Sequence, residues 1–152
     1  MAELVFIGTL HCGSTDKDEL KDIILDVDPN LMLVEISEKD IQINKISSYP
    51  EEMIFALNFA RQNNITCKGF DSNLNVLKEG MTKKDELEII KKQEQVIKNY
   101  SWKDFNKSKL NKKISQIENK LIDSKKRAQR ENNMKSNIEK LIPKEGIVLI
   151  IT

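Results

Sequence analysis

Cysteine and histidine are scarce in this chain of 152 residues, which contains two cysteines and one histidine. Cys12 and Cys67 match neither the spacing of a metal site nor the framework of a disulfide-rich secreted domain. We therefore expect two free thiols in a reducing compartment. The single histidine, His11, is the only imidazole that the chain offers for acid–base chemistry or metal binding.

Long hydrophobic runs are absent as well. No apolar run reaches the roughly 18 residues of a membrane span, and no basic region or cleavage site precedes the first predicted strand. Apolar residues make up 39% of the chain and charged residues 32%, which favours a globular domain with one core and a strongly charged surface. We expect a cytoplasmic protein that spans no membrane.

The net charge of +1 conceals an uneven distribution. Residues 1–77 contain 6 basic and 13 acidic side chains, whereas residues 78–130 contain 16 basic and 8 acidic ones. The sequence therefore consists of an acidic first half followed by a lysine-rich segment with helical periodicity.

The first half alternates between strand and helix patterns. Unbroken apolar runs favour fully buried strands, and apolar residues at helical spacing favour helices that pack on a sheet. We expect parallel strands joined by right-handed crossovers. Between two of these elements, residues 41–49 fit an edge strand, a frayed helix or an ordered loop equally well. The patterns predict strands at 4–7, 31–36 and 65–70, and helices at 16–26 and 50–62.

Residues 82–141 have a strongly helical pattern, which includes an apolar stripe at 110–122 and a predicted hinge at 99–106. A last apolar run at 147–151 predicts one more buried strand. The predicted fold is a small, mostly parallel α/β sheet with flanking helices and a long helical hairpin inserted before the last strand. The predicted single domain, 1–152, comprises a βαβαβ core (1–77), a helical insertion (78–142) and the final strand (146–152).

Three side chains that suit acid–base or metal chemistry follow the predicted strands. His11 comes after the first strand, Glu35 lies near the end of the second, and Asp71 follows the third. Because the carboxyl ends of parallel strands meet at one edge of a sheet, we expect these groups on the same rim. An imidazole and two carboxylates can hold a divalent cation that activates water, or act as acids and bases without a metal.

Structural roles compete with this interpretation. A lone histidine after a strand is as often a hydrogen-bonded turn residue, and Asp71 can cap a following helix. Glu35 is the strongest of the three candidates, because a carboxylate in an apolar strand is costly to bury without a partner. Cys12 and Cys67 are expected to be small core or rim residues, with a catalytic cysteine beside His11 as the alternative.

Short segments of the chain carry a family resemblance. Residues 8–11 (GTLH) and 29–35 (PNLMLVE) resemble the opening of the TraB/PrgY/GumN/Tiki superfamily, with Asn30 where aspartate is usual. The similarity continues through the helix and strand of 52–71 and recurs at 130–134 (RENNM), so that it covers most of the chain.

The resemblance implies a metal-dependent, hydrolase-like fold, with peptidase activity in the Tiki branch. It maps the family's first histidine onto His11, its strand glutamate onto Glu35 and its late arginine onto Arg130. The family's second Gly-x-x-His, expected just after the last strand, is missing because the sequence ends at Thr152. Three explanations are open: Asp71 replaces that ligand, catalysis has been lost, or the rest of the site belongs to a longer chain.

The predicted hairpin is strongly basic. Residues 98–130 carry 11 basic and 3 acidic side chains, and Tyr100 and Trp102 lie among them. Such helices can track a phosphate backbone, but we favour a solvated lysine-rich face and do not expect nucleic-acid binding. Arg127 and Arg130, spaced i, i+3, are better suited to clamp an anionic group.

The sequence therefore predicts a hydrolase or peptidase of the TraB type that uses a divalent ion (manganese, cobalt or zinc) on a peptide or small anionic substrate. The alternative is a non-catalytic regulatory module that binds a protein or nucleic acid through the hairpin. Homodimerisation through the long helices is compatible with either function. The predicted catalytic residues are His11, Glu35 and Arg130, the metal ligands are His11, Glu35 and Asp71, and the substrate-binding residues are Gly8, Thr9 and Arg127.

Overall fold

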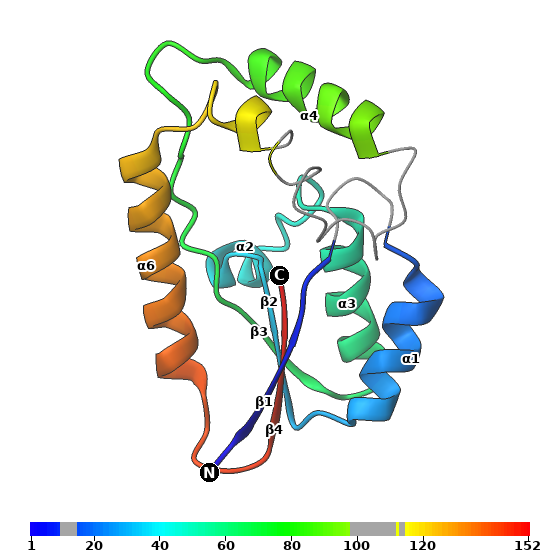
Figure 1. Ribbon diagram of the computed structural model, residues 1–152. Helices are drawn as coiled ribbons and strands as arrows, with labels where there is room; N and C mark the ends of the chain where they lie inside the picture. Colours follow the sequence, from blue (N-terminus) through cyan, green and yellow to red (C-terminus); the bar gives the residue numbers. More distant parts are fainter. Residues whose placement is uncertain (10–14, 98–111, 113–114) are drawn as a thin grey trace. The chain divides into compact units, whose positions relative to one another are not determined.

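The structure is a computed structural model that describes residues 1–9, 15–97, 112 and 115–152 (Figure 1). The chain divides into two compact units, one formed by Met1–Asn73 with Asn132–Thr152 and the other by Leu74–Glu131. Within the described ranges, no helix is long and apolar enough to cross a membrane.

The first unit is built on a sheet of four parallel strands. In chain order these are β1 (Glu3–Ile7), β2 (Leu31–Val34), β3 (Thr66–Gly69) and β4 (Ile147–Ile151), arranged across the sheet as β1-β4-β2-β3. The two central strands are the most apolar, and β2 is buried along its whole length. The predicted small α/β fold with a parallel sheet is confirmed.

Helix α1 (Lys17–Val27) shows why the chain folds locally as the sequence predicts. Its N-cap, Asp16, accepts hydrogen bonds from the backbone N–H groups of Asp18 (2.9 Å) and Glu19 (3.3 Å). It ends where Asp28 adopts a left-handed conformation with φ 45°.

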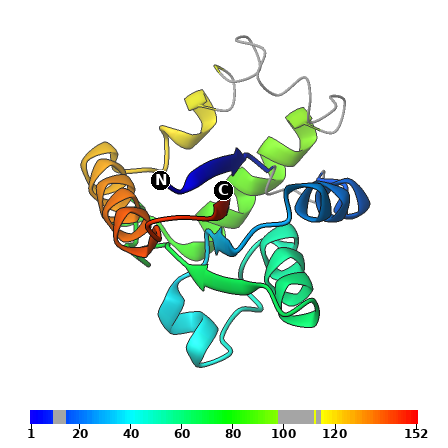
Figure 2. The ribbon, with the colours of Figure 1, turned by 90° about the horizontal axis from the view of Figure 1, so that it is seen from below.

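Helices cover both faces of the sheet (Figure 2). On one face, α1 and α3 (Glu51–Gln62) enclose a core with β2 and β4. On the other face, the last turns of α6 (Ser124–Leu141) lie on the sheet. This second core contains Leu31, Leu33, Phe70, Val148 and Ile150, against which Met134, Ile138 and Leu141 of α6 pack.

The prediction that residues 4–7 form a fully buried strand is wrong. The strand exists, but it lies at the edge of the sheet, and the exposed fractions of Leu4 and Phe6 are 40% and 63%. Only Val5 and Ile7, on the opposite face of the strand, pack against the α1–α3 core. An apolar run therefore does not distinguish a central strand from an edge strand.

One further prediction needs correction, and one set of alternatives is resolved. The run 31–36 is a strand only as far as Val34, so Glu35 follows β2 and does not lie inside it. Residues 41–49, left open above, form the end of the short helix α2 (Glu38–Gln42) and a loop that leads to α3.

The second unit contains α4 (Lys83–Ile97) and the beginning of α6. The helix predicted from the apolar stripe at 110–122 ends early. Residues 119–121 form a turn, and Ile122 makes an antiparallel bridge with Leu77. Asp123 then caps α6, since its carboxylate accepts hydrogen bonds from the N–H groups of Lys125 and Lys126. The hinge predicted at 99–106 lies outside the described residues.

Candidate functional site

The carboxyl ends of the four parallel strands meet at one edge of the sheet, which we call the carboxyl edge. Backbone hydrogen bonds extend the sheet into the segments that follow the strands. The N–H of Glu35 donates to the carbonyl of Ile151 (3.2 Å), and the N–H of Asp71 donates to the carbonyl of Ile36 (3.2 Å). These bonds place two of the predicted site residues at the edge where open parallel sheets bind ligands.

Glu35 and Asp71 are each half-buried, and each residue has an interaction partner. Glu35 follows β2, next to the end of β4, and Asp71 comes two residues after the end of β3. The structure thus places both carboxylates at the carboxyl edge, as the sequence predicted. Whether they act in chemistry stays a prediction.

A third carboxylate at this edge was not recognised from the sequence as a site residue. Glu52 lies in the first turn of α3, and its exposed fraction is 1%. Because α3 runs back along the sheet from the carboxyl edge toward the start of β3, its first turn lies at that edge. Glu52 also has an interaction partner, and the helix N-terminus stabilises negative charge. Its neighbour Glu51 is exposed and pairs with Lys17 (2.9 Å).

No metal centre forms from the described side chains alone, because no three histidine, cysteine, aspartate or glutamate residues among them can hold an ion together. His11, the predicted ligand and acid–base group, lies outside the described residues, as does Cys12. Cys67 is a free thiol on β3 whose pKa burial raises to about 12, so it is a poor nucleophile.

Gly8 and Thr9 follow β1, and Thr9 connects that strand to the end of β4. Thr9 donates two hydrogen bonds to the carbonyl of Thr152, from its N–H (2.7 Å) and from Oγ1 (2.9 Å). Gly8 is exposed, and a Cβ atom added there would meet nothing within 4 Å. The backbone at Gly8 is therefore open to a ligand, whereas the hydroxyl proton of Thr9 is already donated within the protein.

A polar network around Tyr49 ties the chain before α3 to the ends of β2 and β3. The Tyr49 hydroxyl accepts a hydrogen bond from the buried N–H of Ser37 (3.2 Å) and lies 2.7 Å from Oδ2 of Asp40 and 3.2 Å from Oδ1 of Asn73. Nδ2 of Asn73 also donates to Asp40 (3.0 Å). This network anchors the entry to α3 and hence the turn that carries Glu52.

The charges of these groups follow from their contacts. Burial is the main cause that raises the pKa of Tyr49 to about 12, and its hydrogen bond to the Asp40 carboxylate acts in the same direction. The hydrogen bonds from Tyr49 and Asn73 lower the pKa of Asp40. Tyr49 is therefore a neutral, structural hydroxyl over the physiological pH range.

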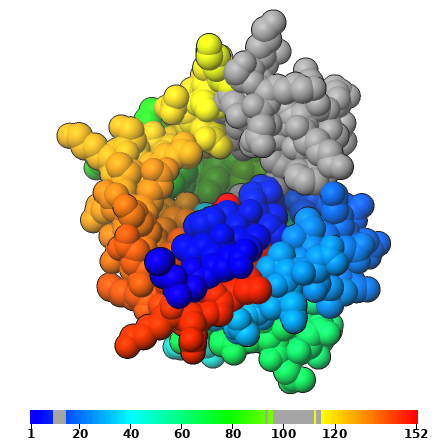
Figure 3. Space-filling view, turned by 60° about the horizontal axis from the view of Figure 1, so that its bottom comes forward, coloured from blue at the N-terminus to red at the C-terminus, as the bar shows by residue number. Residues whose placement is uncertain are grey.

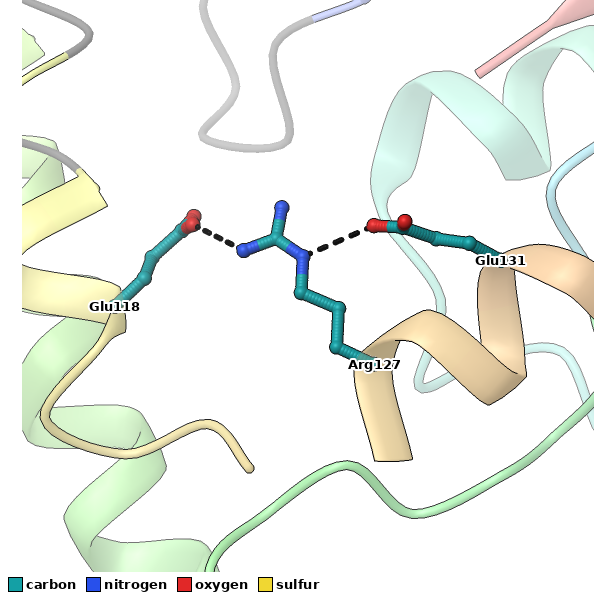
Figure 4. A network of polar contacts seen from close by, with 3 residues as sticks. All are labelled: Glu118, Arg127 and Glu131. Carbon is teal, nitrogen blue, oxygen red and sulfur yellow. Dashed lines mark hydrogen bonds and ion pairs between the residues drawn. The ribbon is translucent and has the colours of Figure 1, made fainter. Parts of the chain in front are cut away.

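The two predicted anion-binding arginines belong to the second unit. Arg127 donates to Glu118 through Nη1 and to Glu131 through Nε, both at 3.1 Å (Figure 4). Those two carboxylates raise its pKa, although partial burial acts against them. Arg130 also has an interaction partner. The contact of either arginine with a substrate stays a prediction.

Comparisons with known proteins leave the chain without an assigned family. No protein-family model matches it, and no curated protein and no solved structure does either. The resemblance of its short motifs to the TraB/PrgY/GumN/Tiki superfamily therefore remains an interpretation of the sequence.

Proposed function

We propose that this chain is a hydrolase-like domain of the TraB kind that cleaves peptide or small anionic substrates at the carboxyl edge. The observation that supports this most is the burial of Glu52, whose exposed fraction is 1%. Burying a carboxylate is expensive unless its partners compensate, so a buried acid at this edge needs a reason, and a role in a site is one. With Glu35 and Asp71, it brings three carboxylates to the place where α/β sheets bind ligands.

Hydrolysis needs one group to accept a proton from water and another to return a proton to the leaving group. In this proposal, Glu35 accepts the proton as water attacks the carbonyl carbon of the substrate. His11 then donates a proton to the leaving group as the scissile bond breaks, and it regains a proton when the one on Glu35 is released. Glu52, buried behind the edge, is a positioning residue that holds a polar group of the site in place.

The described residues do not form a metal centre by themselves, so a divalent metal site at this edge would need His11 as a ligand. No step of the proposed reaction depends on a metal. Thermal unfolding with manganese, cobalt and zinc ions tests metal binding separately. A rise in melting temperature that His11→Ala abolishes supports a metal site, and the absence of a shift with every ion removes it.

The hydrolase activity itself is tested by incubating the full chain with a mixture of peptides and identifying the products by mass spectrometry. We expect cleavage products from the wild type and from the control Asp26→Asn, which alters an exposed acid on α1. Glu35→Gln should give none, because the amide cannot accept the proton. A folded wild type without products, but with salt-dependent nucleic-acid binding, would instead favour the regulatory module.

A further inference from the structure

The outer side of β1 has no partner strand in the part of the chain that the structure describes. On the inner side, the carbonyl of Ile7 accepts a hydrogen bond from the N–H of Thr152 on the β4 side (3.0 Å). Alternate residues of a parallel strand face the same neighbour. The N–H and C=O groups of Leu4 and Phe6 therefore point toward the open side.

The side chains along this edge are apolar and exposed. Leu4 and Phe6, with exposed fractions of 40% and 63%, share one face of β1. The last turns of α6 cover β2 and β4 on that face, but β1 lies at the surface (Figure 3). Open backbone groups and adjacent apolar side chains are the combination that recruits another strand.

The two edges of the sheet differ in their protection. β1 contains no lysine or proline, which commonly protect edge strands. On β3, at the opposite edge, Lys68 is exposed and the N–H of Gly69 already donates to the carboxylate of Glu38 (2.7 Å). Among the strands that the structure describes, β1 of a second copy therefore offers the least protected edge to β1.

We propose that β1 pairs antiparallel with β1 of a second copy, about a two-fold axis at Val5, the middle residue of the strand. In this register Leu4 of each copy lies opposite Phe6 of the other. The exposed apolar side chains therefore cover one another. It also sets the two Glu3 carboxylates at opposite ends of the pair, whereas parallel pairing in register would bring them together. A two-fold contact is closed and forms a dimer, not a fibre.

The contact between two five-residue strands is small, at the low end of the sizes of specific interfaces. The dimer is therefore in equilibrium with the monomer. Sedimentation velocity of the full chain over a range of concentrations measures it directly. The wild type should shift from monomer to dimer as concentration increases.

Two exposed apolar residues provide a matched pair of variants. Phe6→Lys should raise the dimer dissociation constant by about tenfold or more, because it replaces the central apolar contact with charge on both copies. Leu25→Lys, at a residue of α1 that is 52% exposed, should leave the dissociation constant unchanged. A folded wild type that stays monomeric, or a Phe6→Lys variant that dimerises like the wild type, overturns the proposal.

The register has its own test. In the predicted pair the two Val5 residues are opposite each other at a non-hydrogen-bonded position, where Cα atoms lie about 4.5 Å apart, within the range of a disulfide. Val5→Cys should therefore form a covalent dimer on mild oxidation, faster than Leu25→Cys. Equal rates for the two variants contradict the pairing at Val5.

Discussion

Removing the Tyr49 hydroxyl should destabilise the protein, because that oxygen joins the start of α3 to the segments that follow β2 and β3. In Tyr49→Phe the N–H of Ser37 loses its acceptor (3.2 Å), and Ser37 is only 5% exposed. An unpaired buried donor costs about 1–3 kcal/mol. Tyr49 itself is half-buried, so water partly replaces the lost oxygen, and we expect the free energy of unfolding to fall by about 1 kcal/mol.

For a chain of this length, that loss lowers the melting temperature by about 2–4 °C. Thermal unfolding followed by circular dichroism measures the change. Ser48→Ala, which removes an exposed hydroxyl from the same loop, is the control and should leave the melting temperature unchanged. If Tyr49→Phe melts at the same temperature as the wild type, the network does not anchor α3.

The stability difference between the wild type and Tyr49→Phe should also depend on pH. The pKa of Tyr49 is raised from 10.0 in the unfolded chain to about 12 in the folded one, chiefly by burial. The contribution of the neutral hydroxyl is therefore complete below pH 10 and is lost as pH rises through about 12. The stability difference between the wild type and Tyr49→Phe should shrink across this range, and a constant difference would contradict the assignment.

Two further substitutions test the close contacts and hydrogen bonds of the sheet. Gly69→Ala would drive a Cβ atom into the carbonyl oxygen of Ile36, and we expect the free energy of unfolding measured with denaturant to fall by about 1–3 kcal/mol. The control Gly8→Ala, whose added Cβ atom meets nothing within 4 Å, should lower it far less. Asn30→Ala removes the oxygen that accepts a hydrogen bond from the N–H of Ile147 (2.8 Å), for a loss of about 0.5–1 kcal/mol in the same assay, whereas Asn30→Asp keeps an acceptor and should be close to neutral.

The four strands, α1 and α3 could be predicted because each has a local signal, whereas the short helix α2 could not. The apolar runs specify the strands, and Asp16 specifies the start of α1. The order of strands across the sheet has no such local signal. The exposure of Phe6 follows from the edge position of β1, which only the tertiary arrangement determines.

The candidate site was predictable only in part for a similar reason. Glu35 and Asp71 could be assigned to the carboxyl edge from their positions after apolar runs. Glu52 could not, because two glutamates after a proline are typical of an exposed first turn of a helix. The signal that distinguishes Glu52 from Glu51 is its spacing of four and seven residues to Ala56 and Phe59, which places it on the buried face of α3. At Leu121 the spacing was misleading in another way. It fits a helix, but the residue lies in a turn.

The most direct test of the proposed site compares the hydrolysis of a cleaved peptide by Glu52→Gln and Glu51→Gln. These neighbouring acids differ in burial, since Glu52 is 1% exposed and Glu51 lies on the surface. We predict that kcat falls by about 100-fold or more in Glu52→Gln, with KM nearly unchanged and the protein still folded. Glu51→Gln should retain wild-type kinetics. Equal kcat values for the two folded variants would contradict a functional site at the carboxyl edge in which Glu52 is a positioning residue.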